Sequence, residues 1–117
     1  MKDRFYITNL IKKLIGDFDN YLTNFPNKDI ELKSEIMNTS YHMLKIAYEA
    51  NSTYDIKKRI DIIDKIISYI KYLDYLINLC YEKKIIKSKK YLRFGSNLDY
   101  LLKYVLGWHK VSLSNLK

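Results

Sequence analysis

Apolar residues recur every three or four positions in the longest periodic run of this chain, residues 54–84, and this run constrains the fold more than any other feature. Such spacing places side chains on one face of an α-helix, which has about 3.6 residues per turn. The run includes adjacent isoleucines that would suit a β-strand, but the helical period persists over about seven turns and therefore predicts a helix. The apolar stripe consists of Ile56, Ile60, Ile63, Ile67, Ile70, Leu73, Ile77 and Cys80.

Three further segments of the chain have the same period. With only three Gly and one Pro in 117 residues, few positions favour tight turns, so a few long elements are expected. The predicted helices cover about residues 3–24, 28–50, 54–84 and 88–110, followed by a loose tail over 111–117. Residues 1–117 are therefore predicted to form a single all-α domain, an up-down-up-down antiparallel four-helix bundle.

Local signals set the expected helix boundaries. Pro26 ends the first helix, because the residue before a proline is pushed out of the helical conformation. Ser52 followed by Asp55 fits the capping-box pattern at the start of the third helix. Ser88 is the expected cap of the fourth helix.

The third predicted helix carries more apolar surface than one bundle core needs. A second stripe lies beside the main one, and a helix that is apolar over more than about half its circumference needs cover on both sides. We therefore predict an oligomer interface on this stripe. The alternative is a wide core-facing stripe whose tyrosine hydroxyl reaches water. The predicted interface residues are Ile62, Ile66, Tyr69, Leu76 and Leu79.

Positive charge is concentrated in the second half of the chain. Residues 1–56 carry seven Lys or Arg and eight Asp or Glu, whereas residues 57–117 carry fourteen and five. Such a one-sided field attracts polyanions, although basic faces are often solvated surface. The densest group, here called the basic cluster, consists of Lys83, Lys84, Lys87, Lys89, Lys90 and Arg93.

Two members of the basic cluster are placed against local stability. Lys89 and Lys90 fall in the first turn of the fourth predicted helix, where the helix dipole is positive and disfavours cations. This placement indicates an anionic ligand, and the cluster is our predicted nucleic-acid-binding site. Tyr81 is the aromatic side chain expected to be accessible beside it, since Tyr91 and Phe94 lie on the apolar face of the fourth predicted helix.

No catalytic or metal-binding pattern is present in the sequence. Metal sites in bundles use a Glu three residues before a His, but His42 and His109 both lack one and lie on different predicted helices. Gly16, Gly95 and Gly107 stand alone, so no glycine-rich loop can hold phosphates. We expect a non-enzymatic binding protein with no catalytic residue, metal or cofactor.

Cysteine usage and hydropathy indicate where such a chain works. Cys80 is the only cysteine, which excludes an internal disulfide and fits a reducing compartment. The N-terminus shows no apolar signal-peptide core. No run of about 18–20 uncharged apolar residues is present for a membrane span. We therefore expect a cytoplasmic protein without a membrane partner.

Several short motifs, in order over about residues 5–110, resemble one known family. This family comprises the accessory variability determinant of diversity-generating retroelements and the proteins encoded in 23S rRNA intervening sequences, both small four-helix bundles. The matching motifs are Phe25-Pro26, Glu49-Ala50-Asn51, Ile85, Tyr91 and Leu106-Gly107-Trp108-His109-Lys110.

The resemblance is closer to the retroelement accessory proteins, and it implies specific partners. It implies a homopentameric ring that binds template RNA or DNA and the retroelement reverse transcriptase, supporting mutagenic cDNA synthesis without catalysing it. The basic cluster would supply the contacts. The alternative is an intervening-sequence type of protein, which would act as a structural or protein-interaction module without a specific nucleic-acid role.

Overall fold

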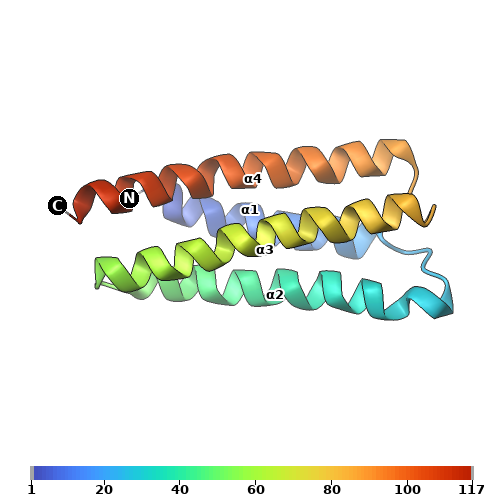
Figure 1. The fold of residues 1–117 in the computed structure, drawn as a ribbon, viewed down its shortest axis with the longest axis horizontal. Helices are drawn as coiled ribbons and strands as arrows, with labels where there is room; N and C mark the ends of the chain where they lie inside the picture. The colour runs from blue at the N-terminus through green and yellow to red at the C-terminus, as the bar shows by residue number, and fades with distance from the viewer. Residues whose placement is uncertain (1, 117) are drawn as a thin grey trace.

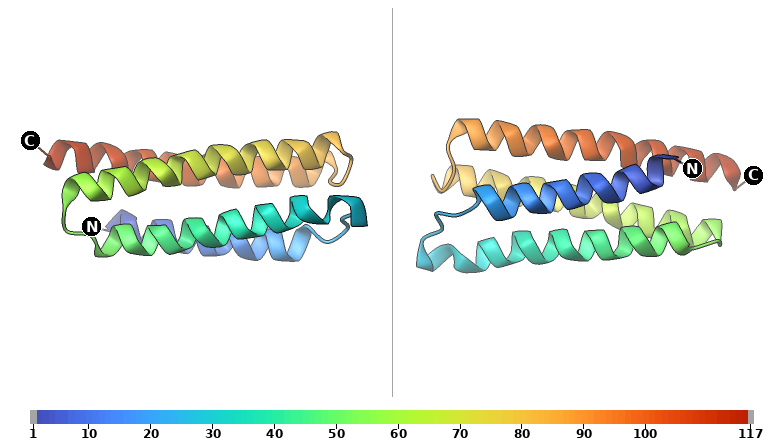
Figure 2. Two further views of the ribbon diagram at one scale, coloured as in Figure 1. Left: turned by 60° about the horizontal axis from the view of Figure 1, so that its bottom comes forward. Right: turned by 180° about the vertical axis from the view of Figure 1, so that it is seen from behind.

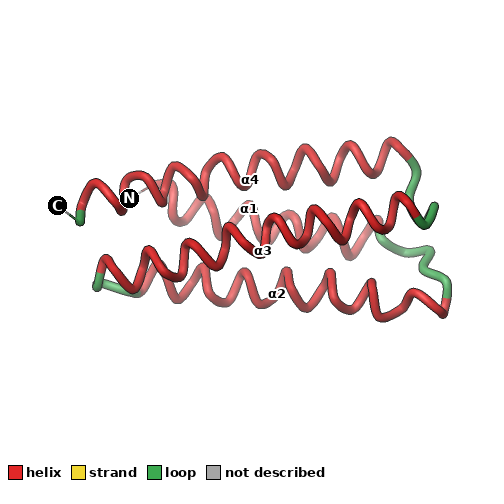
Figure 3. Tube along the Cα trace, viewed as in Figure 1, coloured by secondary structure: helices red, strands yellow, loops and turns green. Residues whose placement is uncertain are grey.

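The chain folds into four long helices packed side by side. The computed structural model describes residues 2–116, and within them no strand is present. The helices are α1 (Lys2–Tyr21), α2 (Ile30–Ser52), α3 (Ile56–Glu82) and α4 (Ser88–Asn115), with a short 3₁₀ helix, η1 (Asn27–Asp29), before α2. Consecutive long helices run in opposite directions (Figure 1, Figure 3). The predicted all-α, up-down-up-down four-helix bundle is confirmed.

The order of contacts defines the bundle geometry. α1 packs against α2 and α4, and α3 packs against α2 and α4, while in the described part of the chain no Cα atoms of the diagonal pairs come within 8 Å of each other. The molecule is elongated, with principal extents of 49 × 22 × 19 Å. None of the helices within residues 2–116 has an apolar run long enough to cross a bilayer.

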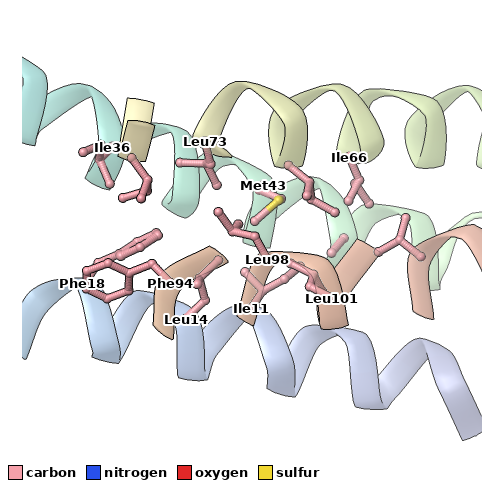
Figure 4. Packing of buried hydrophobic residues seen from close by; sticks show 14 of the residues in the cluster. Ile11, Leu14, Phe18, Ile36, Met43, Ile66, Leu73, Phe94, Leu98 and Leu101 are labelled. Atoms are coloured by element: carbon pink, nitrogen blue, oxygen red, sulfur yellow. The ribbon is translucent and has the colours of Figure 1, made fainter. Parts of the chain in front are cut away.

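All four helices contribute to one continuous hydrophobic core (Figure 4). Toward the end of the bundle that carries the α3–α4 turn, the rings of Phe18 and Phe94 meet edge to face, with centroids 5.1 Å apart, an arrangement that aromatic quadrupoles favour. Trp108 is 1% exposed. Cys80 is also buried, and desolvation raises the pKa of its thiol to about 11, which makes it a poor nucleophile or metal ligand.

The C-terminal part of the chain differs from its prediction. Residues 111–115 were expected to form a loose tail, but α4 continues to Asn115. The reason lies in the core stripe, because Val105, Trp108 and Ser112 are all buried at helical spacing. The prediction of a tail is therefore wrong for residues 111–115, and Lys117 lies outside the described residues.

Helix ends also differ from the sequence-based expectations. α1 ends at Tyr21, before the Pro26 stop. Asp55 itself caps α3, its Oδ1 accepting hydrogen bonds from the backbone amides of Lys57 (3.0 Å) and Lys58 (3.3 Å). Ser52 belongs to α2 and takes no part in that cap, and the N-cap position of α4 is Lys87, one residue before Ser88.

The second apolar stripe of α3 is largely covered by the bundle itself. Ile66 and Leu76 are 0% and 4% exposed and belong to the core, whereas Ile62, Tyr69 and Leu79 are half-buried against it. Because α3 packs on both α2 and α4, the bundle covers a wider arc than one helix contact would. Contrary to the prediction, Ile66 and Leu76 therefore leave no apolar surface exposed on a single bundle.

Candidate nucleic-acid interface

The basic cluster surrounds the turn between α3 and α4, at one end of the bundle (Figure 1). The backbone amide of Lys84 donates to the Tyr81 carbonyl (3.0 Å), and that of Ile85 donates to the Cys80 carbonyl (2.9 Å). These two bonds form a Schellman motif, which satisfies carbonyls at the end of α3. The structure therefore brings the predicted site residues together through a regular helix stop.

Lys84 occupies the left-handed position of this motif, with φ of 63°. Glycine is the usual residue there, since a Cβ at positive φ crowds the following carbonyl. Lys84 is the only non-glycine residue with positive φ in the part of the chain that the structure describes.

Three cations of the basic cluster have partners within the bundle. Lys83 forms an ion pair with Asp29 of η1 at 3.2 Å. Arg93 forms one with Asp17 at 3.2 Å, and its guanidinium lies 4.5 Å from the ring centroid of Tyr21. The first contact joins η1 to the end of α3, and the contacts of Arg93 join the C-terminal part of α1 to α4.

Lys90 is the third paired cation, and its contact corrects the sequence-based argument. Its Nζ donates to the backbone carbonyl of Tyr21 at 2.9 Å, at the end of α1, where the helix dipole is negative. The cost expected from its position at the start of α4 is offset by this contact with another helix. The placement of Lys90 is therefore not a sign of an anionic ligand.

Lys84, Lys87 and Lys89 make up the rest of the basic cluster, and we call them the free lysines. All three are exposed, and among the described residues their ammonium groups have no ion-pair, hydrogen-bond or cation–π partner. Two hollows flank the turn, and Lys87 lines both. The remaining positive charge of this end is thus free for an external anion.

Tyr81 supplies an accessible aromatic ring beside the free lysines. It is 40% exposed and lines one of the two hollows with Lys84 and Lys87. Its ring stacks on that of Tyr91, with centroids 4.3 Å apart and an interplanar angle of 11°. Tyr91 is half-buried and Phe94 fully buried. The expectation that Tyr81 is the accessible member of the three is confirmed.

The two histidines have contacts within the bundle. His109 Nε2 lies 2.8 Å from Asp64 Oδ1, and the His42 ring meets Tyr69 edge to face at 5.3 Å. Across residues 2–116, no three His, Cys, Asp or Glu side chains come together as a metal site requires. Among the groups that the structure describes, the strongest candidate for function is therefore the set of free lysines with Tyr81.

No protein-family model, curated protein or solved structure matches this chain. The resemblance to the retroelement accessory and intervening-sequence proteins therefore rests on the short motifs of the sequence alone. Any proposal about the partners of this chain therefore rests on the geometry of the site together with those motifs.

Replacing Lys84 by glycine is expected to raise the free energy of unfolding by roughly 0.5–1 kcal/mol, because glycine adopts positive φ without crowding a Cβ. Urea unfolding followed by circular dichroism measures the change. The matched control is Lys84→Ala, which removes the same charge but keeps the Cβ, and it should give no gain. Equal gains in both variants would show that the charge, not the backbone conformation, sets the local stability.

Proposed function

We propose that this chain is a non-enzymatic accessory protein that binds nucleic acid through the free lysines at the α3–α4 turn. The observation that carries the proposal is the contrast within the basic cluster. Three of its cations form contacts between helices or with η1, namely Lys83, Lys90 and Arg93. The other three are exposed and unpaired among the described residues, namely Lys84, Lys87 and Lys89.

Three unpaired ammonium groups around one turn match the chemistry of a phosphate backbone. Each offers up to three hydrogen-bond donors, and each neutralised phosphate releases condensed counterions. Lys84 adds a further argument, because a cation stands where glycine would be more stable. Tyr81 beside them offers a surface on which an unpaired base can stack.

The resemblance to the retroelement accessory proteins supplies the rest of the proposal. It supports binding to a reverse transcriptase and its template in the cytoplasm, and assembly into a ring of five subunits. In such a ring the free lysines are repeated on every subunit, so avidity rises without any new contact. Ile66 and Leu76 contribute no surface to that assembly, since each bundle buries them itself.

A second candidate function is that of a structural module of the intervening-sequence type. The observation that favours it is that half of the basic cluster has intramolecular partners. Lys83, Lys90 and Arg93 bind Asp29, Tyr21 and Asp17 and so join the helices at this end. On this view the remaining lysines are solvated surface.

Fluorescence anisotropy of a labelled RNA, titrated with protein between about 50 and 200 mM salt, separates the two candidates. The test variant replaces the free lysines with glutamine (K84Q/K87Q/K89Q). The control variant makes the same charge change at exposed α3 and α2 positions (K45Q/K65Q/K71Q). If the free lysines hold three phosphates, the test variant should lower the slope of log K against log salt by about two to three, and the control variant should lower it by less than one.

Two results would contradict the proposal. An absence of wild-type binding at the lowest salt would favour the structural module. Equal losses in the two variants would show that net charge alone drives binding and that the α3–α4 turn is not the site.

A further inference from the structure

The surface between α1 and α4, here called the α1–α4 groove, is lined by residues of both helices. The two helices run antiparallel side by side (Figure 2). A series of contacts crosses between them: Lys90 to Tyr21 at 2.9 Å, Asn97 Nδ2 to Asp17 Oδ2 at 2.9 Å, and Tyr100 hydroxyl to Tyr6 hydroxyl at 2.8 Å. These contacts follow one another along the two helices, from the end of the bundle at the α3–α4 turn to the end at Tyr6.

The groove contains a hollow of about 220 Å³ that is more enclosed than the two hollows at the turn. Tyr6 on α1 and Tyr100 on α4 lie on its two sides, and they are 37% and 42% exposed. Lys13 is exposed and, among the described residues, has no side-chain partner. The described residues that line it are Tyr6, Leu10, Lys13, Leu14, Asn97 and Tyr100.

The tyrosine rings of this groove are held in place by one another. Tyr6 meets the ring of Tyr104 edge to face, with centroids 4.9 Å apart, and Tyr100 and Tyr104 are 5.0 Å apart. Tyr100 also hydrogen-bonds to Tyr6. Rings ordered before a ligand arrives lose little entropy on binding, so they form a prepared surface for flat groups.

The charge of the groove fits a polyanion. The contacts that cross between α1 and α4 include one carboxylate, that of Asp17. This carboxylate is buried and is paired with both Arg93 and Asn97. Lys13 is the one charged residue in the described lining of the hollow, and its ammonium group is unpaired among the described residues. A negatively charged backbone therefore meets a cation in the groove and no unpaired carboxylate among these residues.

We propose that the α1–α4 groove binds single-stranded nucleic acid, with bases against Tyr6 and Tyr100 and phosphates toward Lys13. A duplex keeps its bases stacked within the helix and cannot place them on these rings, whereas a single strand can. This inference rests on the proposed function, because the free lysines mark where the strand enters. It adds that the bound nucleic acid is single-stranded, and it adds a second set of contacts. At about 1.5 Å per residue, Lys89 and Tyr100 are roughly 16 Å apart along α4.

Anisotropy with a labelled oligo(dT) strand and with a labelled duplex of equal length tests the inference. Tyr100→Ala should weaken binding of the single strand about 5- to 160-fold, the range that corresponds to loss of one stacking ring, and should change duplex binding less than twofold. Tyr100→Phe keeps the ring and should retain most of the affinity. The matched control is Tyr41→Ala on α2, where the tyrosine is 52% exposed and outside the groove.

A measurement on the unaltered protein gives a result that does not depend on whether the variants fold. Oligonucleotides carrying 5-iodouracil, which cross-links to stacked aromatic residues on illumination, should label Tyr6 or Tyr100 in peptides identified by mass spectrometry. Labelling confined to Tyr81, with full affinity in Tyr100→Ala, would overturn the groove while the proposed function stands. Absence of any nucleic-acid binding would instead remove the proposed function, and the groove with it.

Discussion

Replacing Trp108 by alanine is expected to lower the free energy of unfolding by about 3–5 kcal/mol, the usual cost of removing a large aromatic side chain from a core. Trp108 is 1% exposed, and its neighbours in the α4 stripe, Val105 and Ser112, are buried as well. The surrounding helices can collapse only in part, so a cavity remains and adds to the lost transfer free energy. Urea unfolding followed by circular dichroism measures the loss, since the variant has no tryptophan for fluorescence.

The control for this prediction lies two residues away on the same helix. Leu106 is 48% exposed, and substitutions at exposed positions usually change stability by no more than about 0.5 kcal/mol. Leu106→Ala should therefore be close to neutral in the same assay. A loss below about 1 kcal/mol for Trp108→Ala would show that this end of α4 is not packed as described.

The number, order and direction of the helices could be predicted because periodicity is a property of each segment alone. The apolar stripe of α3 predicted at Ile63, Ile70 and Leu73 is indeed in the core at these residues. Helix ends were less predictable, because they depend on capping geometry. Asp55 rather than Ser52 caps α3, and both are good capping residues whose choice depends on the backbone at the turn.

The site could be predicted as a group of residues but not as a set of contacts. The basic cluster is visible in the sequence because its members are close in the chain. Their partners are not, since Lys90 reaches a carbonyl 69 residues away and Arg93 a carboxylate 76 residues away. The sequence therefore could not separate the paired cations from the free lysines. The hydroxyl contact between Tyr6 and Tyr100, 94 residues apart, was missed for the same reason.

This division of the basic cluster changes how its function should be tested. Arg93 bridges α1 and α4 through a carboxylate that is buried. Removing Arg93 would leave Asp17 with fewer partners in a poorly solvated position, which is unfavourable. A loss of nucleic-acid binding in an Arg93 or Lys90 variant would then mix structural and functional effects. Glutamine substitutions at Lys84, Lys87 and Lys89 keep the Cβ of each residue and remove no contact between helices, so their effect on binding can be read directly.

Ile66→Ala is expected to lower the free energy of unfolding by about 2–5 kcal/mol, by the same amount at low and at high protein concentration. Ile66 is 0% exposed within one bundle, so its contacts form whether or not subunits associate. An interface residue would behave differently, because contacts between subunits stabilise the fold by mass action and weaken on dilution. Thermal unfolding over a wide range of concentration, with sedimentation velocity to follow assembly, distinguishes the two.

The matched control for Ile66 is Tyr75→Ala on the same helix, where the side chain is 55% exposed. Its effect on the unfolding of a single bundle should be within about 0.5 kcal/mol. If the loss in Ile66→Ala disappears at concentrations where the protein is monomeric, the side chain belongs to an interface and the core assignment is wrong. If the loss persists, any assembly of this chain must use surface other than Ile66, and the half-buried Ile62, Tyr69 and Leu79 become the residues of the predicted stripe to substitute next.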